Sequence, residues 1–213
     1  MGRLQLTARQ SRIYLAAWLV ALAAVVGVFA GLVVSRWLTP APQPVLSGGL
    51  VMDARQLAAP DFTLRDQTGA NVSLRGLRGK VVALTFLDTQ CQNLCPLQAA
   101  FLGAAQSDVN RRTPFEVVIV SVRPEADSPA TIAAFATAHG LGRRYHWLTG
   151  SRSDLQGVWT AYGVSVQPAQ GGGDLAHSSV IYLIDRSGYE RVGFQDVPET
   201  GAFETDVQVL DRA

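Results

Sequence analysis

The chain has 213 residues, room for one ordinary domain with an appendage, and its formal net charge is +1. Four arginines and no acidic residue fall in the first 51 positions, whereas the remainder carries 14 basic and 17 acidic residues. Because the sequence contains no basic stretch of the kind that binds nucleic acid, we expect no nucleic-acid partner. Two cysteines are also too few for the disulfide framework of a small secreted domain.

The N-terminal region contains one long apolar segment, residues 13–34, without a charged residue. Its 22 residues match the roughly 20 that a helix needs to cross a bilayer. Arginines precede the segment without acidic neighbours. The positive-inside rule therefore predicts cytoplasmic residues 1–12, a transmembrane signal anchor at 13–35 and export of everything that follows. A cleaved signal peptide is the alternative, although the run exceeds the roughly 7–15 apolar residues of a typical signal-peptide core.

Residues 36–58 are rich in proline and glycine and show no sustained periodicity, which predicts a linker. We expect the folded domain to occupy residues 59–213 and to open with a hairpin of two short strands, at 62–64 and 72–74. The apolar run at residues 81–87 follows, and it is typical of a central strand that is covered on both faces.

The rest of the chain alternates between helix and strand signals. Pro96 is tolerated only in the first turn of a helix, so a helix is expected to begin between residues 92 and 95. Ser128 and Pro129 form a cap-and-start signal for a second helix, which Gly140 ends. Other expected elements are strands at 115–122, 180–184 and 189–194, helices at 154–162 and 201–210, and a glycine-rich loop at 167–174. The order predicts an α/β, thioredoxin-like fold with an N-terminal β-hairpin, preceded by a single transmembrane helix.

The two cysteines, Cys91 and Cys95, lie four residues apart where the first central strand becomes a helix. This spacing puts both sulfurs on one face of the helix N-terminus, where free N–H groups and the macrodipole favour thiolates. Two soft thiolates suit Cu(I), whereas a structural zinc site normally needs four ligands. A redox dithiol and a pair of buried, purely structural thiols are the alternatives.

His177 is the third candidate ligand, because it directly precedes the strand at 180–184. In a thioredoxin-type sheet that strand runs antiparallel beside the cysteine-bearing strand, so its start lies next to the other strand's end. His139 falls in the last turn of a helix, where a cation is ordinarily favourable, and we interpret it as structural. His146 lies between two aromatic residues and is most simply an edge residue. The topology therefore predicts one metal site, built from both cysteines and His177.

Several motifs resemble the Sco/SenC family, copper-handling proteins of bacterial and mitochondrial membranes that help build the binuclear copper centre of cytochrome c oxidase. The motifs with the greatest specificity are the dithiol followed by Pro96 and the strand that His177 leads. The others are Pro60-Asp61-Phe62-Thr63-Leu64, Leu77-Arg78-Gly79-Lys80-Val81-Val82, Thr85-Phe86, the segment 121–129, Leu148-Thr149-Gly150 and the run from Ser178 to Asp185.

The resemblance implies copper ligands at Cys91, Cys95 and His177, the same residues that the topology selects. It also implies an N-terminal membrane helix and a copper acceptor, either the copper-binding subunit of cytochrome c oxidase or another protein. The expected location is the bacterial cytoplasmic membrane, single-pass, with the C-terminal domain in the periplasm, or the equivalent in the mitochondrial inner membrane.

The sequence departs from the family pattern beside the site. Gln92 stands where the family usually has proline, Asp88 where it commonly has an aromatic residue, and Arg123 where it has an aspartate. Asp88 and Arg123 each follow a predicted central strand, and these two strands are expected to be parallel neighbours. We therefore expect this pair to approach each other beside the metal site, where they would alter the charge that a docking partner meets.

The leading functional hypothesis is a copper chaperone, a binding protein and not an enzyme, which holds one copper ion and delivers it to an acceptor. The alternative is an extracytoplasmic thiol-disulfide oxidoreductase that reduces cysteines of an oxidase subunit or another exported protein. It would use Cys91 and Cys95 as a redox disulfide and would not need His177. A peroxidase of the peroxiredoxin kind fits poorly, because Asp88 stands where its threonine would be. A purely structural domain is the remaining alternative.

Overall fold

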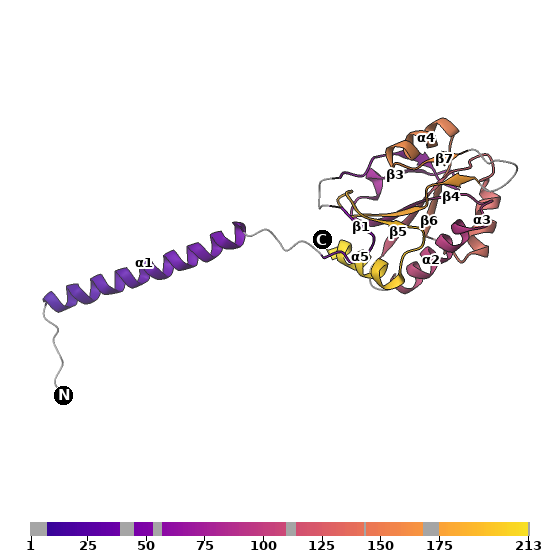
Figure 1. The fold of residues 1–213 in the computed structure, drawn as a ribbon. Coiled ribbons are helices and arrows are strands. Elements are labelled where there is room, and N and C mark those ends of the chain that lie inside the picture. The colour runs from indigo at the N-terminus through magenta and orange to yellow at the C-terminus, as the bar shows by residue number, and fades with distance from the viewer. Residues whose placement is uncertain are drawn as a thin grey trace. The chain divides into compact units, whose positions relative to one another are not determined.

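The computed structural model describes residues 8–38, 45–52, 57–109, 114–142, 144–167 and 175–212. It divides into two compact units, residues 1–43 and 44–213. The first unit contains α1 (Ala8–Leu38), within which Ala17–Arg36 is long and apolar enough to cross a membrane and has none of its residues buried (Figure 1). The expected apolar helix is therefore present as a candidate membrane span.

A mixed six-stranded sheet, in the strand order β1-β10-β9-β4-β5-β6, forms the centre of the described part of the second unit. β4 pairs in parallel with β5 and β5 with β6, whereas β9 and β10 are antiparallel additions on the other side of β4. The bounds are β1 (Leu50–Val51), β4 (Val81–Leu87), β5 (Phe115–Ser121), β6 (Tyr145–Leu148), β9 (Val180–Ile184) and β10 (Glu190–Gln195).

Helices cover both faces of the sheet. On one face lie α2 (Leu94–Val109), α3 (Pro129–Ala138) and α5 (Thr200–Arg212) (Figure 1). The other face carries α4 (Arg152–Ala161), the hairpin of β2 (Thr63–Arg65) and β3 (Asn71–Ser73), and the short helix η1 (Arg75–Leu77). All seven residues of β4 are buried, because its alternate side chains point into two separate core clusters. The predicted thioredoxin-like α/β fold with an N-terminal hairpin is confirmed.

Local capping explains where two helices begin. The Ser128 hydroxyl oxygen accepts the N–H of Thr131 at 3.2 Å, and Pro129 is the first helical residue of α3, as predicted. Ser151 caps α4 in the same way through the N–H of Asp154 at 3.2 Å, so α4 begins at Arg152, two residues before the predicted start.

The structure differs from the expected boundary between linker and domain. β1 lies inside the segment expected to be a linker and pairs with β10. Just before it, the buried Asp206 carboxylate on α5 accepts the N–H groups of Ser47 at 2.6 Å and Gly48 at 3.0 Å. These contacts place the start of the second compact unit at Pro44, not near residue 59.

Two further differences concern the second half of the chain. β6 was not predicted as a strand, because its four residues show no regular alternation of apolar and polar side chains. Its strand conformation is fixed by its hydrogen bonds to β5. The short strands β7 (Val166–Gln167) and β8 (Ala176–His177) were also not predicted, and they pair with each other. Most of the expected glycine-rich loop, residues 168–174, lies outside the described residues.

Candidate metal centre

The cysteines occupy the loop and helix start that follow the buried strand β4. Pro96 is the third residue of α2, where its missing N–H removes no helical hydrogen bond. Cys95 is 1% exposed and Cys91 is half-buried, and neither cysteine is in a disulfide. The loop is held in place partly by the N–H of Cys91, which donates to the Asp88 carbonyl oxygen at 3.3 Å.

The His177 imidazole reaches the dithiol from β8. Its Nε2 lies 3.6 Å from Cys95 Sγ, and its Nδ1 lies 2.9 Å from the carbonyl oxygen of Ser178. Because a carbonyl oxygen only accepts, Nδ1 carries the proton and Nε2 presents its lone pair to the sulfur. Ligands bonded to one metal ion at about 2.0–2.3 Å are separated by about 3.5 Å, so this pair is spaced as two ligands of one ion. The strand order was expected to bring His177 toward Cys91, and the contact that the structure shows is with the other cysteine, Cys95.

The two thiols interact with each other. A hydrogen bond with Cys91, burial and the charge of Cys91 raise the pKa of the Cys95 thiol well above its ordinary value. This raised pKa favours the neutral thiol of Cys95 and opposes the thiolate-favouring effect that we expect of the helix N-terminus. A cation between the sulfurs would reverse this effect, since a bound metal favours deprotonated thiols.

The three donors do not form a closed cage. Cys95 contacts both Cys91 and His177, but among the described residues no three His, Cys, Asp or Glu side chains lie together as a ready metal cluster. The donor types themselves, two thiols and a neutral imidazole, are those that Cu(I) prefers. The donors would have to move closer together to hold one ion.

The other two histidines lie elsewhere in the domain. His139 caps the C-terminus of α3, and its ring packs on Phe135 with the ring centroids 4.5 Å apart. His146 lies in the edge strand β6, and its Nδ1 is 2.9 Å from a carboxylate oxygen of Asp66. Both have structural contacts, which agrees with their interpretation from the sequence.

Asp88 and Arg123 meet as expected, with Arg123 Nε 3.1 Å from Asp88 Oδ2. The parallel register of β4 and β5 pairs Leu87 with Ser121 and so brings the two residues together. Burial raises the pKa of Asp88, and both the N–H of Gln90 and the charge of Arg123 oppose that rise. Asp88 Oδ2 and Arg123 Nη2 are buried and have no hydrogen bond among the described residues, so charge attraction holds the pair.

Gln98 is a buried residue near the site that sequence reasoning missed. Its Nε2 donates to the carbonyl oxygen of Asp196 at 2.6 Å and to Ser179 Oγ at 3.1 Å. The amide therefore ties the helix that carries Cys95 to the segment that follows His177. A glutamine three residues after a cysteine on an apolar helix face is a weak signal for such a role.

Asp127 is the second missed residue. Its carboxylate accepts the N–H of Thr89 at 3.0 Å, Ser121 Oγ at 2.6 Å and Trp147 Nε1 at 3.1 Å. It thereby joins the start of the cysteine loop to β5 and β6. No local pattern in the sequence predicts these three contacts, since the partners come from separate parts of the chain.

Comparison with known proteins decides the family. The family model for SCO1/SenC matches residues 51–203, which is well over half of the chain. The chain belongs to the SCO1/SenC family. A curated relative, the SCO1 protein homolog of Bacillus subtilis, is 27% identical over an alignment of 162 residues, and the match covers 70% of this chain and 84% of the relative.

Solved structures agree with this assignment. BsSco, described with a disulfide switch and as a member of the Sco family of cytochrome c oxidase assembly proteins, has a TM-score of 0.66 and 26% identity, covering 76% of this chain and 97% of its own. Copper-bound ScoI of Bradyrhizobium japonicum has a TM-score of 0.58 and 25% identity, and the match covers 71% of this chain and 97% of the ScoI chain.

Proposed function

We propose that this protein is a membrane-anchored copper chaperone that binds one copper ion through Cys91, Cys95 and His177 and delivers it during cytochrome c oxidase assembly. The observation that carries the proposal is the approach of His177 Nε2 to Cys95 Sγ at 3.6 Å, with Nδ1 held 2.9 Å from the carbonyl oxygen of Ser178. A purely redox dithiol has no need of an imidazole lone pair in that position.

Each donor has a distinct part in the proposed site. The cysteines supply charge and soft sulfur, and the histidine supplies a neutral third ligand. Cys95 is buried while Cys91 is partly exposed, so copper would be held from one side and approached from the other. An acceptor's ligands could then attack the ion before the donor ligands leave.

The family relatives support copper as the cargo. One solved structure of similar fold holds copper, and another relative is described as an assembly protein of cytochrome c oxidase. For this chain, the copper-binding subunit of the oxidase is the acceptor that we propose. The apolar helix α1 would tether the domain, and the arginines before it would keep its N-terminus in the cytoplasm and the domain in the periplasm.

The test is a Cu(I) titration of the reduced full-length protein in detergent. We expect one bound ion, weaker binding in His177→Ala, and near-complete loss when either cysteine becomes alanine. His139→Ala is the matched control, because that histidine packs on Phe135 away from the dithiol, and it should bind copper as the unmodified protein does. Equal affinity in His177→Ala would contradict the proposed ligand set.

A thiol-disulfide oxidoreductase is the second candidate function. The hydrogen-bonded contact between the thiols of Cys91 and Cys95 favours it, because such a pair can also form a disulfide. The two functions differ in their need for His177. Reduction of an oxidised peptide that is unchanged in His177→Ala, in a protein that binds no copper, would favour the oxidoreductase.

A further inference from the structure

A large hollow, separate from the dithiol, lies over β9 and β10 on the sheet face that carries α4. Its volume is about 770 Å³, which is within the usual range for small-molecule sites. The end of α4 contributes Ala161 to its lining, and Gly193 leaves part of the floor without a side chain. The walls are mainly apolar and include Leu50, Met52, Leu57, Val180, Tyr162 and Tyr182.

Glu190 makes this hollow more than an apolar groove. The residue is 5% exposed and lines the hollow, yet its carboxylate has no hydrogen bond or ion pair within the described residues. The nearest cationic neighbour in sequence, Arg191, is already paired with Asp185 at 3.0 Å. Its side-chain oxygens are not fully enclosed, so the carboxylate opens into the hollow, where a cationic ligand could reach it.

The two tyrosines near Glu190 cannot supply the missing donor. Tyr162 Oη donates to the carbonyl oxygen of Pro60 at 2.8 Å, and Tyr182 Oη donates to the carbonyl oxygen of Tyr162 at 2.9 Å. Burial and then the charge of Glu190 raise the pKa of both phenols, so the carboxyl is electrostatically close to them. The hollow thus offers oxygen acceptors and aromatic faces, with the phenol protons already in use.

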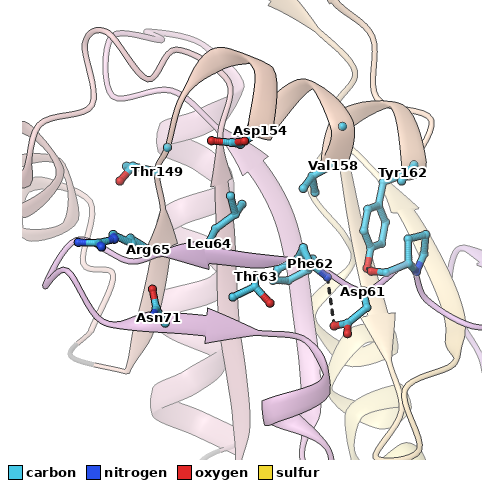
Figure 2. A pocket seen from close by; sticks show the side chains of 14 residues that line it. Asp61, Phe62, Thr63, Leu64, Arg65, Asn71, Thr149, Asp154, Val158 and Tyr162 are labelled. Atoms are coloured by element: carbon cyan, nitrogen blue, oxygen red, sulfur yellow. Dashed lines mark hydrogen bonds between the residues drawn. The ribbon is translucent and has the colours of Figure 1, made fainter.

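The neighbouring groove between β2 and α4 provides a contrast (Figure 2). Its carboxylates have partners: Asp61 accepts the N–H of Phe62 at 3.1 Å and lies 3.4 Å from Arg75, and Asp154 accepts a bond from Ser151. Tyr162 stands at the end of that groove and also lines the hollow. Of these two sites, only the hollow therefore has a carboxylate, that of Glu190, without a partner among the described residues.

We propose that the hollow binds a small organic cation, a primary ammonium group on an apolar chain or ring. The ammonium would donate hydrogen bonds to the Glu190 carboxylate, and the rings of Tyr162 and Tyr182 would attract its charge. The apolar body would pack on Leu50 and Met52. A neutral alcohol would leave the carboxylate without a counter-charge, and an anion would be repelled by it.

Met52 makes a direct readout available. The chain has two methionines, so the full-length protein in lipid nanodiscs, labelled with ¹³C at the methionine methyl groups, gives two signals. Met52 lines the hollow, so its signal reports binding there. The probe is phenethylammonium, with phenethyl alcohol and phenylpropionate as the neutral and anionic comparisons.

Phenethylammonium should shift the Met52 signal saturably, and the affinity should fall at least about tenfold in Glu190→Gln. This variant keeps the shape of a side chain that has no partner, so it should fold. Gly193→Val, whose Cβ would meet only side-chain atoms, the nearest of them 3.4 Å away, should block the floor with its methyl groups. Copper binding should be unchanged in both variants. An unshifted Met52 signal, or equal binding in Glu190→Gln, would overturn the proposal.

A primary ammonium could come from a soluble amine or from an aminolipid headgroup. Nanodiscs made with and without phosphatidylethanolamine distinguish these sources. Competition with phenethylammonium only when the aminolipid is present would identify the headgroup as the ligand. Unchanged probe affinity in both nanodiscs would identify a soluble amine.

Discussion

His177 turns the lone pair of Nε2 toward Cys95 Sγ at 3.6 Å because the carbonyl oxygen of its own neighbour, Ser178, holds the Nδ1 proton at 2.9 Å. The imidazole is therefore already in the tautomer that a metal needs, before any metal is present. Only the approach of Cys91 remains to complete a three-donor site. The following predictions test the contacts that keep these residues in place.

Gln98→Leu should weaken copper binding and lower the free energy of unfolding by about 1–3 kcal/mol, because it leaves the Asp196 carbonyl oxygen without its donor. Gln106→Leu is the matched control. Gln106 is also buried on α2 and donates to a backbone carbonyl oxygen, that of Arg144, but it lies far along the helix from Cys95. Urea unfolding should show similar losses for both, and copper titration should separate them. Unchanged copper affinity in Gln98→Leu would exclude its positioning role.

The Asp88–Arg123 pair should show energetic coupling. Arg123→Gln leaves a buried carboxyl without its cation, so the double variant with Asp88→Asn should be less destabilised than the sum of the single variants, by about 0.5–3 kcal/mol. The exposed pair of Arg152 and Glu125, 3.3 Å apart, is the control, and its coupling should lie within about 0–1 kcal/mol. Additive effects at Asp88 and Arg123 would mean that their proximity has no energetic consequence.

Stability should depend on pH through Glu190. Burial raises the pKa of this carboxyl in the folded state, so its neutral form favours folding at low pH and that contribution is lost as the pH rises through the raised pKa. The groups facing it, Tyr162 and Tyr182, ionise only at far higher pH. Glu190→Gln should therefore gain stability relative to the unmodified protein between about pH 4 and pH 7. A stability difference that stays constant across this range would contradict the assignment.

Oxidation should release copper. The thiolates of Cys91 and Cys95 are the proposed ligands, so a disulfide between them removes both at once. Copper content and the number of alkylatable thiols, measured on the same oxidised samples, should fall together. Copper that stays bound after the disulfide has been verified would show that the ion is held elsewhere.

The central elements of the fold were predictable because their signals are local. The apolar runs that became β4 and β5 and the Ser128 cap of α3 can each be identified within a few residues. β1 could not be predicted, since a two-residue strand has no pattern and its partner β10 lies far along the chain. Local composition indicated a linker where pairing and the Asp206 carboxylate build part of the domain.

The candidate site likewise combines residues that the sequence could predict with residues that it could not. The cysteine spacing is a local signal, and the position of His177 follows from strand order once the fold class is known. Gln98 and Asp127 were missed because their roles depend on bonds to distant segments, and such bonds leave no local trace in the sequence. The raised pKa of Cys95 was also missed, since it depends on burial and on the other thiol.

X-ray absorption spectroscopy of the Cu(I)-loaded full-length protein tests the central claim most directly. We predict two sulfur ligands and one nitrogen ligand, with loss of the nitrogen in His177→Ala, the variant that is expected to retain weakened copper binding. A copper environment with two sulfurs and no nitrogen, or a spectrum that is identical in His177→Ala, would contradict the claim that Cys91, Cys95 and His177 together hold the ion.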